Sequence, residues 1–223
     1  MFREEFLTRQ KDLIPAEVLN KKITIIGAGA IGSFTALALA KMGFHNLTVI
    51  DDDEVDTENM NCQFFRFSDI GSAKVTALQS LIKDFVGVEI AAEQRRIGPT
   101  DVFGGDFVIC AVDNMETRKN LFETVNSEYL IDPRMAAEMA TLSVVPMFDK
   151  KKAESYAKTL FTDDEAVRER CTAKSTMYTV LLLSGQIAKA VKDISTGNSY
   201  VKGFDWFIDK NRLVSFSSEG EKL

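Results

Sequence analysis

The residues that most often build metal sites and catalytic dyads are scarce in this chain of 223 residues. It has one histidine, His45, and three cysteines, none of them in a Cys-x-x-Cys pair. Neither a zinc site nor a disulfide framework can be assembled from this set. A Ser-His or Cys-His catalytic pair would depend on His45, which lies in a predicted turn between a helix and a strand. Metal chemistry must therefore use oxygen ligands.

Positive charge is also in short supply. Lys and Arg number 27 against 33 Asp and Glu, which gives a formal net charge of -6, and no cationic stripe is present that could neutralise a run of phosphates. We therefore expect no nucleic-acid partner. No apolar run approaches the roughly 20 residues that span a bilayer, and residues 1–10 are too charged for a signal peptide. These absences predict a cytoplasmic protein with no membrane partner.

Hydrophobic residues make up 45% of the chain and charged residues 27%, which is typical of a globular protein and predicts one domain over residues 1–223. Short apolar runs typical of buried strands alternate with segments of helical period. This alternation predicts an α/β fold with a Rossmann-like, mostly parallel sheet flanked by helices. The predicted strands are 23–26, 47–50 and 107–112, and the predicted helices are 34–42, 75–85 and 118–125.

The pattern changes in the last third of the chain. A strand is predicted at 141–145, and the polar segment 149–176 predicts a crossover or lid loop. Residues 177–223 predict a C-terminal helix and an antiparallel hairpin. This hairpin, which carries Trp206, has two interpretations: it closes the core at the edge of the sheet, or it lines a groove for the extended tail of a partner.

A glycine-rich turn follows the first predicted strand and opens the first helix. Gly27, Gly29 and Gly32 form a Gly-x-Gly-x-x-Gly pattern, which in this context lets a phosphate approach the N–H groups of a helix N-terminus. Asp51 ends the second strand, where a carboxylate can accept hydrogen bonds from ribose hydroxyls. Residues 20–135 therefore predict a nucleotide-binding core, unless the glycines serve only helix–strand packing. The pattern does not distinguish NAD from ATP.

Further motifs accompany the glycine-rich turn in a fixed order. They are Thr8-Arg9-Gln10, Asp51-x-Asp53-x-Val55, Asn59-x-x-x-Gln63, Ile70-Gly71-x-x-Lys74, and Asp113-Asn114 followed by Arg118. With these motifs the chain resembles the ThiF/MoeB/HesA superfamily, the adenylating domain of ubiquitin-activating enzymes. The resemblance covers about residues 5–135.

The resemblance implies how ATP and Mg²⁺ are bound. Lys74 and Arg9 would contact phosphates as catalytic cations. Asp113 would hold Mg²⁺, a hard ion that prefers oxygen ligands, and Asp51 would hold the ribose. The remaining cofactor contacts would come from Gly27, Gly29, Gly32, Asp53, Asn59, Gln63 and Asn114. In the family the Arg at position 9 reaches across a dimer interface, so the resemblance also implies a homodimer.

The same residues have plainer interpretations. Lys74 could be a solvated lysine at a helix start, and Arg9 could be an ordinary surface residue. Asp113 and Asn114 could merely cap the helix that begins near Glu116. These interpretations remain open at the level of sequence.

One position departs from the family pattern. Cys62 precedes Gln63 where the family usually has an Arg that helps bind the nucleotide phosphates. Arg66 lies four residues further on and could substitute for it. The departure predicts either weaker phosphate binding or a divergent branch. Cys110 lies in a predicted central strand, and we expect it in the core.

Cys171 is the best candidate nucleophile. It begins Cys171-Thr172-Ala173-Lys174, which is similar to a segment of ubiquitin-activating enzymes where the cysteine takes the acyl group as a thioester. Arg170 and Lys174 could stabilise the reactive thiolate. The match is four residues long and the family's preceding Pro is absent, so an ordinary cysteine at a helix start is the alternative.

Together the motifs predict an ATP-dependent adenylyltransferase. It would activate the C-terminal carboxylate of a ubiquitin-like or sulfur-carrier protein as an acyl-adenylate, with thioester formation on Cys171 as an open second step. An NAD-dependent oxidoreductase would leave Lys74 and Asp113 without a role. A catalytically weak nucleotide-binding partner subunit would explain Cys62. A non-protein acyl acceptor, as in tRNA-modifying relatives, is disfavoured because the chain lacks a basic surface.

Overall fold

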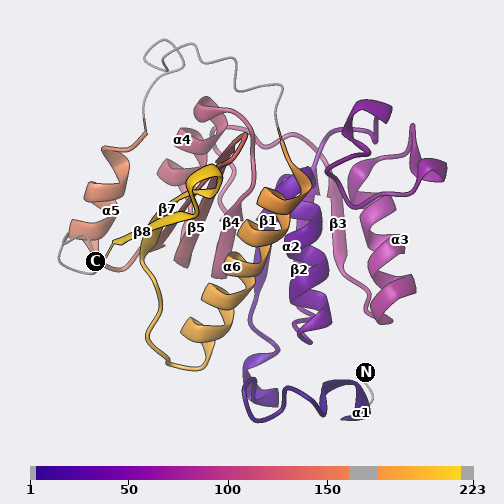
Figure 1. Cartoon of the computed structure of the whole chain (residues 1–223), viewed down its shortest axis with the longest axis horizontal. Coiled ribbons are helices and arrows are strands. Elements are labelled where there is room, and N and C mark those ends of the chain that lie inside the picture. Colours follow the sequence, from indigo (N-terminus) through magenta and orange to yellow (C-terminus); the bar gives the residue numbers. More distant parts are fainter. Residues whose placement is uncertain (1–3, 161–174, 217–223) are drawn as a thin grey trace.

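The computed structural model describes residues 4–160 and 175–216. These residues form one eight-stranded sheet in the order β3-β2-β1-β4-β5-β6-β7-β8, with helices on both faces (Figure 1). The strands are β1 (Ile23–Ile26), β2 (Leu47–Asp51), β3 (Ala91–Gln94), β4 (Gly104–Cys110), β5 (Asn126–Ala136), β6 (Met139–Pro146), β7 (Gly203–Phe207) and β8 (Arg212–Phe216). The helices are α1 (Glu4–Leu7), α2 (Ala30–Lys41), α3 (Lys74–Val86), α4 (Met115–Thr124), α5 (Lys150–Ala157) and α6 (Met177–Ser195).

Strand β5 marks the change from parallel to antiparallel pairing. Strands β3, β2, β1, β4 and β5 are parallel neighbours, and β6, β7 and β8 continue the sheet in antiparallel pairs. This is the predicted Rossmann-like sheet with a C-terminal antiparallel extension. The carboxyl ends of the parallel strands meet at one edge, where such sheets place their ligands.

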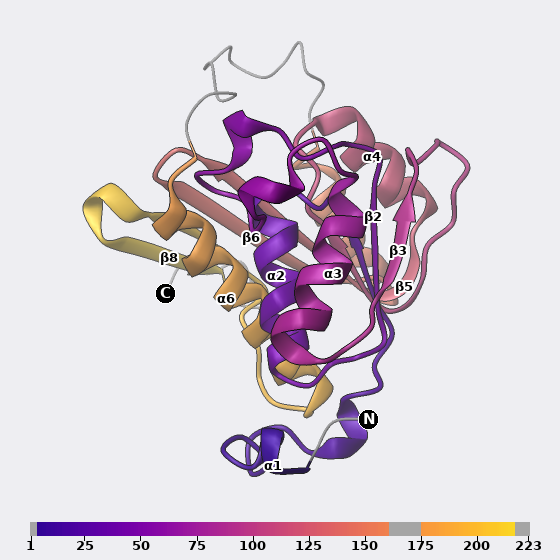
Figure 2. The same cartoon turned by 90° about the vertical axis from the view of Figure 1, so that its right-hand side faces the viewer.

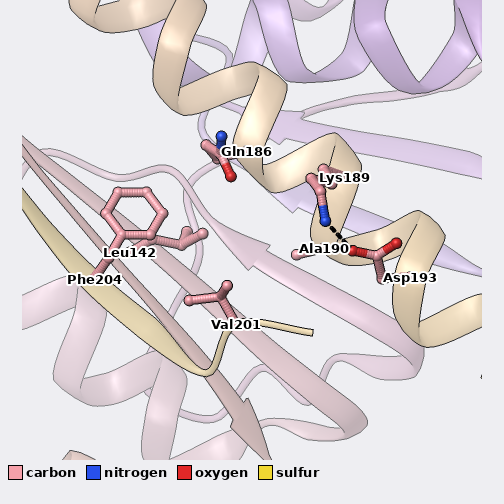
Figure 3. A pocket seen from close by; sticks show the side chains of 7 residues that line it. All are labelled: Leu142, Gln186, Lys189, Ala190, Asp193, Val201 and Phe204. Atoms are coloured by element: carbon pink, nitrogen blue, oxygen red, sulfur yellow. Dashed lines mark hydrogen bonds and ion pairs between the residues drawn. The ribbon is translucent and has the colours of Figure 1, made fainter. Parts of the chain in front are cut away.

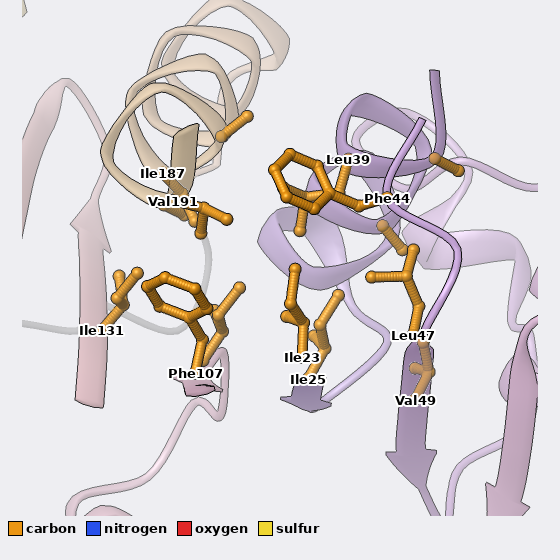
Figure 4. Packing of buried hydrophobic residues seen from close by; sticks show 14 of the residues in the cluster. Ile23, Ile25, Leu39, Phe44, Leu47, Val49, Phe107, Ile131, Ile187 and Val191 are labelled. Carbon is orange, nitrogen blue, oxygen red and sulfur yellow. The ribbon is translucent and has the colours of Figure 1, made fainter. Parts of the chain in front are cut away.

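Successive residues of the central strands face different layers of helices. Ile23 and Ile25 of β1 pack in a cluster with α2, α3 and α6 (Figure 4), whereas Ile26 packs in a second cluster with Leu121 of α4 and Tyr156 of α5. Figure 2 shows α2, α3 and α6 side by side on one face of the sheet. Both faces are therefore buried, which explains why these strands are continuous apolar runs in the sequence.

Helix α2 has buried residues on several sides, because it lies between α3 and α6. Its backbone is also bonded to α6, where Ser184 Oγ donates to the Ile31 carbonyl at 3.3 Å. The last long helix of the described chain therefore covers the helix that follows the glycine-rich turn.

The C-terminal hairpin is confirmed by β7 and β8, in which Trp206 pairs with Leu213. Trp206 packs against the main core cluster, with its ring 6.3 Å from that of Phe204. This contact supports the interpretation that the hairpin closes the core at the sheet edge.

The segment expected as a crossover loop contains helix α5. Asp149 caps this helix, because its side chain accepts the Lys152 N–H at 3.2 Å. The Lys152 ammonium and this capping bond both lower the pKa of the Asp149 carboxyl. Residues 161–174 lie outside the described residues, so the lid remains a prediction. Among the helices that the structure describes, none combines the length and the apolar character needed to cross a membrane.

Candidate active site

The glycine-rich turn lies between β1 and α2, at the carboxyl edge of the sheet. Gly27 has φ +97°, and a Cβ there would lie 2.5 Å from the Ala111 carbonyl oxygen. A Cβ on Gly32 would lie 1.8 Å from the Gly27 oxygen. Both glycines are therefore required by close backbone packing, as the plainer interpretation of this motif expects.

Gly29 has a different role from its two neighbours. Its φ is -75°, and the nearest atom to a Cβ placed there would be Gln63 Nε2 at 4.0 Å. It is the N-cap of α2 and supplies no side-chain cap to the helix. Packing therefore does not require glycine at this position, and its absent side chain leaves the N-terminus of α2 open to an anion.

Asp51 organises the turn from the end of β2. Its Oδ2 accepts the Ala28 N–H at 2.6 Å, and its Oδ1 accepts the Asp53 N–H at 2.8 Å. Because each carboxylate oxygen has more than one acceptor position, these bonds are compatible with a further bond to a ribose hydroxyl. Asp51 thus links the glycine-rich turn to the loop that follows β2.

Lys74 is buried, with 6% of its surface exposed. Its Nζ donates to Asp53 Oδ2 at 2.7 Å, and its backbone N–H bonds the Asp53 carbonyl at 3.0 Å. The solvated interpretation of Lys74 is therefore wrong. The Asp53 side chain remains 63% exposed, so the pair joins a buried cation to a carboxylate at the surface.

The segment that carries Asn59, Cys62 and Gln63 packs beside the N-terminus of α2. Phe64 N–H donates to Ser33 Oγ at 3.1 Å and holds the segment against the helix. Cys62 is buried, and its thiol lies 3.8 Å from the Asn59 carbonyl oxygen. The buried Oε1 of Gln63 has no hydrogen-bond partner among the described residues. The Gln63 amide is therefore available to a ligand at the glycine-rich turn.

Arg66 does not replace the Arg that the family has at position 62. Its guanidinium donates to Asp69 at 3.2 Å and to Asp84 of α3 at 3.1 Å. These two carboxylates raise the pKa of Arg66. With its guanidinium held by these carboxylates, Arg66 does not supply the cation that the family pattern has at the position of Cys62.

Asp113 lies three residues after the end of β4, and Ala111, two residues before it, packs against Gly27 and Gly32 of the glycine-rich turn. Its carboxylate is exposed and accepts the Asn114 Nδ2–H at 3.3 Å. Asn114 caps α4, because its Oδ1 accepts the Thr117 N–H at 2.8 Å. The capping interpretation is thus right for Asn114, whereas the Asp113 carboxylate does not take part in the cap.

A buried ionic network behind Asp113 was not predicted from the sequence. Arg118 of α4 pairs with Asp132 of β5, and Asp132 also accepts bonds from Arg134 Nε at 2.8 Å and from the Tyr156 hydroxyl at 2.9 Å. Burial raises the pKa of Tyr156 to about 12. Cys110 is 1% exposed, which confirms its place in the core, and this burial raises the pKa of its thiol.

Arg9 lies far from these residues within the same chain. Its segment packs against the turn after α2, where Gln10 Nε2 donates to the Met42 carbonyl at 2.6 Å. His45 lies at that turn as well, and its N–H bonds the Leu19 carbonyl at 3.4 Å. This is the edge of the sheet opposite the glycine-rich turn (Figure 1). The structure therefore does not bring Arg9 or His45 to Lys74 and Asp113, and Cys171 lies outside the described residues.

Two other features of the described residues fit a nucleotide site less well. A hollow between α6 and strands β6 and β7 is lined by Leu142, Gln186 and Phe204, among others, and lies beside the Lys189–Asp193 ion pair (Figure 3). No residue of the nucleotide motifs lines it. Carboxylate oxygens of residues 51–53 lie within 4.8 Å of one another, but cations already pair with two of these three side chains.

Comparison with known proteins identifies the family. The family model described as ThiF matches residues 10–217. The chain belongs to the ThiF family. The NEDD8-activating enzyme E1 catalytic subunit of Arabidopsis thaliana is 40% identical over 103 residues, which cover 44% of this chain and 23% of that protein. SUMO-activating enzyme subunit 2 of Dictyostelium discoideum is 35% identical over 108 residues, or 45% of this chain and 16% of that protein.

Solved structures share the fold of this ThiF-family chain. Escherichia coli MccB crystallised with ATP has a TM-score of 0.71 at 15% identity, covering 92% of this chain and 66% of that one. PaaA has a TM-score of 0.71 at 17% identity, covering 96% of this chain and 75% of that one. This chain spans less than a third of the curated relatives that it matches.

Proposed function

We propose that the chain is an ATP-dependent adenylyltransferase that activates a C-terminal carboxylate of a ubiquitin-like or sulfur-carrier protein. The observation that carries the proposal is the convergence of three groups at the carboxyl edge of the sheet. These are the open N-terminus of α2 at Gly29, the buried Lys74 ammonium and the exposed Asp113 carboxylate. Membership of the ThiF family and the likeness to activating enzymes support it.

The residues present fit a nucleotide with a divalent cation. The space at Gly29 would be filled by any Cβ, and the amide of Gln63, whose Oε1 has no partner among the described residues, lies beside it through Nε2. Asp113 supplies the hard oxygen ligand that Mg²⁺ prefers, and Asp51 lies where a ribose is bound in such folds. When bound, Mg²⁺ neutralises phosphate charge.

The proposed reaction needs positioning and charge neutralisation more than covalent participation by the protein. A carboxylate oxygen of the acyl substrate attacks the α-phosphorus of ATP, an acyl-adenylate forms, and pyrophosphate leaves. The N–H groups of α2 and the Lys74 ammonium bind phosphate oxygens and hold the α-phosphorus in line with the carboxylate. Asp51 and Gln63 orient the nucleoside. Loss of the family Arg at Cys62 lowers the affinity for the phosphates.

The proposal extends to the assembly and to the fate of the adenylate. A homodimer would bring Arg9 of one copy to the phosphates of the other, because Arg9 cannot reach the site of its own chain. As a second step we propose that the Cys171 thiolate attacks the acyl carbonyl of the adenylate, which forms a thioester and releases AMP. The compartment that we propose is the cytoplasm. An NAD-dependent oxidoreductase is the competing candidate, but it gives the buried Lys74 no role.

Calorimetric titration with ATP and Mg²⁺, and separately with NAD, tests the proposal. We expect wild-type protein to bind ATP and not NAD, and Asp113→Ala to weaken ATP binding in Mg²⁺ at least about tenfold, because a metal ligand is lost. Asp209→Ala removes an exposed carboxylate of the hairpin and serves as the matched control. Tight binding of NAD without binding of ATP would refute the adenylation proposal.

A further inference from the structure

Arg118 is a buried cation that lies directly behind the proposed metal ligand. It is 5% exposed and projects from the first turns of α4 to the carboxyl ends of β4 and β5. Its Nη2 donates to the Val112 carbonyl at 2.7 Å, and its Nη1 lies 3.3 Å from the Cys110 carbonyl oxygen. Val112 is the residue that immediately precedes Asp113.

A guanidinium is costly to bury unless it is paired and its donors are satisfied. Asp132, which is 0% exposed, pairs with Arg118. Asp132 is itself held by Tyr156 and Arg134. The rigid, forked shape of the guanidinium lets it contact this carboxylate and three carbonyl groups at once, which a lysine ammonium cannot reproduce.

Strand β5 needs such a partner at this point. Its register with β4 ends at the Ile109–Ile131 pair, and β5 continues beyond it through Pro133 to Ala136. Arg118 Nη1 lies 3.5 Å from the Pro133 carbonyl oxygen. The guanidinium therefore joins the end of β4 to β5 just beyond the last pair of their register.

The contact with Val112 fixes the direction in which Asp113 leaves the strand. The peptide bond from Val112 to Asp113 is planar, so holding the Val112 carbonyl also sets the Asp113 N–Cα bond. On its other side, Asp113 is followed by Asn114, which caps the helix that carries Arg118. Asp113 thus lies between two anchors on the same helix.

We propose that Arg118 is a positioning residue that holds the Asp113 carboxylate at the place where a divalent cation binds. This inference rests on the proposed function for its use of the cation, but its claim about the position of Asp113 stands on the contacts of Arg118. A merely structural Arg118 would support the fold without any specific effect on Asp113.

Two variants separate these roles. Arg118→Lys keeps a charge opposite Asp132 but loses the forked contacts. Arg118→Met combined with Asp132→Asn removes both buried charges, keeps an acceptor for Tyr156 and Arg134, and replaces the single variant if that one does not fold. Hydrogen–deuterium exchange of the ligand-free full chain is the first measurement. We expect the amides of residues 113–115 to exchange at least fivefold faster in either variant, with the amides of β1 unchanged.

Metal dependence of nucleotide binding is the second measurement. We expect the Mg²⁺ concentration that gives half-maximal ATP binding to rise at least fivefold in the variants, while the affinity for AMP without metal stays within twofold of wild type. Leu39→Ala, in the buried face of α2 away from Asp113, is the control for general destabilisation. It should lower the melting temperature and leave both measurements unchanged.

The outcomes decide the two proposals separately. A folded variant with unchanged exchange at residues 113–115 overturns the positioning role, even if its melting temperature falls. Faster amide exchange at residues 113–115 with an unchanged Mg²⁺ requirement for ATP binding also overturns the positioning role, because the Asp113 carboxylate would then act equally well when displaced. If wild-type protein binds no ATP, the proposed function fails, and the exchange measurement alone decides whether Arg118 positions Asp113.

Discussion

Lys74 and Asp53 form a pair whose members have very different surroundings. The lysine side chain is 7% exposed and the aspartate side chain 63%. Because Asp53 is largely in solvent, the pair contributes only about 1 kcal/mol to stability, which does little to offset the cost of burying an ammonium group. A buried cation with so weak a stabilising partner is consistent with the phosphate contact that we propose for Lys74.

Substitution of each member of this pair distinguishes the two roles. We expect Lys74→Met to weaken ATP binding at least about tenfold, because a phosphate loses a charge-assisted bond. Asp53→Asn should retain ATP binding, because the ammonium remains and loses its competing carboxylate. Calorimetric titration measures the ATP affinity of each variant, and urea unfolding measures its free energy of unfolding. If both variants weaken ATP binding equally, Lys74 acts only through its pair with Asp53.

Some local contacts of the site residues were predictable from the sequence, whereas their contacts with a nucleotide stay predictions. Asn114 caps the next helix, and Asp51 follows an apolar strand and faces the glycine-rich turn; both roles depend on neighbouring residues. The network of Arg118, Asp132 and Tyr156 could not be predicted in the same way. Its members come from α4, β5 and α5, and an isolated Arg or Asp in a sequence carries no signal of burial.

At the scale of elements, the turn between β1 and α2 contains two kinds of glycine. Two of them pack tightly against backbone atoms, and the third borders open space. Gly27 and Gly32 touch backbone atoms, whereas Gly29 borders open space next to Gln63. One motif therefore contains two positions where packing requires glycine and one, Gly29, where it does not.

Alanine substitutions in this motif should have opposite effects on stability and binding. Gly27→Ala should destabilise the fold by at least about 2 kcal/mol, because φ is positive and a carbonyl oxygen is in the way. Gly29→Ala should change stability by less than about 1 kcal/mol and weaken ATP binding, because the methyl group occupies the phosphate approach. Thermal unfolding and calorimetry check these effects. Wild-type affinity in Gly29→Ala would show that the phosphates do not bind there.

Strands were predictable where both of their faces are buried. Apolar runs marked β1, β2, β4 and β6, since each is covered by helices. Strand β3 lies at the sheet edge with mostly exposed residues, and β5 carries Asp132, Pro133 and Arg134. Asp132 pairs with Arg118 of α4 and with Arg134 of its own strand, and nothing local in the sequence predicts that these charges are buried in a strand.

At the scale of the whole molecule, Arg9 and Asp113 lie at opposite edges of one sheet. The segment of Arg9 is fixed to the turn after α2 by Gln10, so no adjustment of the Arg9 side chain spans the sheet. A contact between Arg9 and phosphate therefore requires a second copy of the chain.

Mixing two defective variants tests this arrangement. Arg9→Ala and Asp113→Ala should each lose tight ATP binding, and an equal mixture after subunit exchange should regain about 0.25 tight sites per chain, because half of the dimers carry one intact site. Calorimetry gives the number of sites, and sedimentation confirms the dimer. A mixture that forms dimers without regaining any tight sites would exclude Arg9 from its partner's site.

The cover that α6 provides for α2 also has a consequence for synthesis on the ribosome. The bond between Ser184 and Ile31 joins residues 153 positions apart, and contacts so distant in sequence form late. A nascent chain that ends before Met177 has already made α2 but not the helix that shields it. Until α6 emerges, the apolar residues of α2 that it covers are exposed to solvent. During this interval the growing chain is most exposed to aggregation and to capture by chaperones.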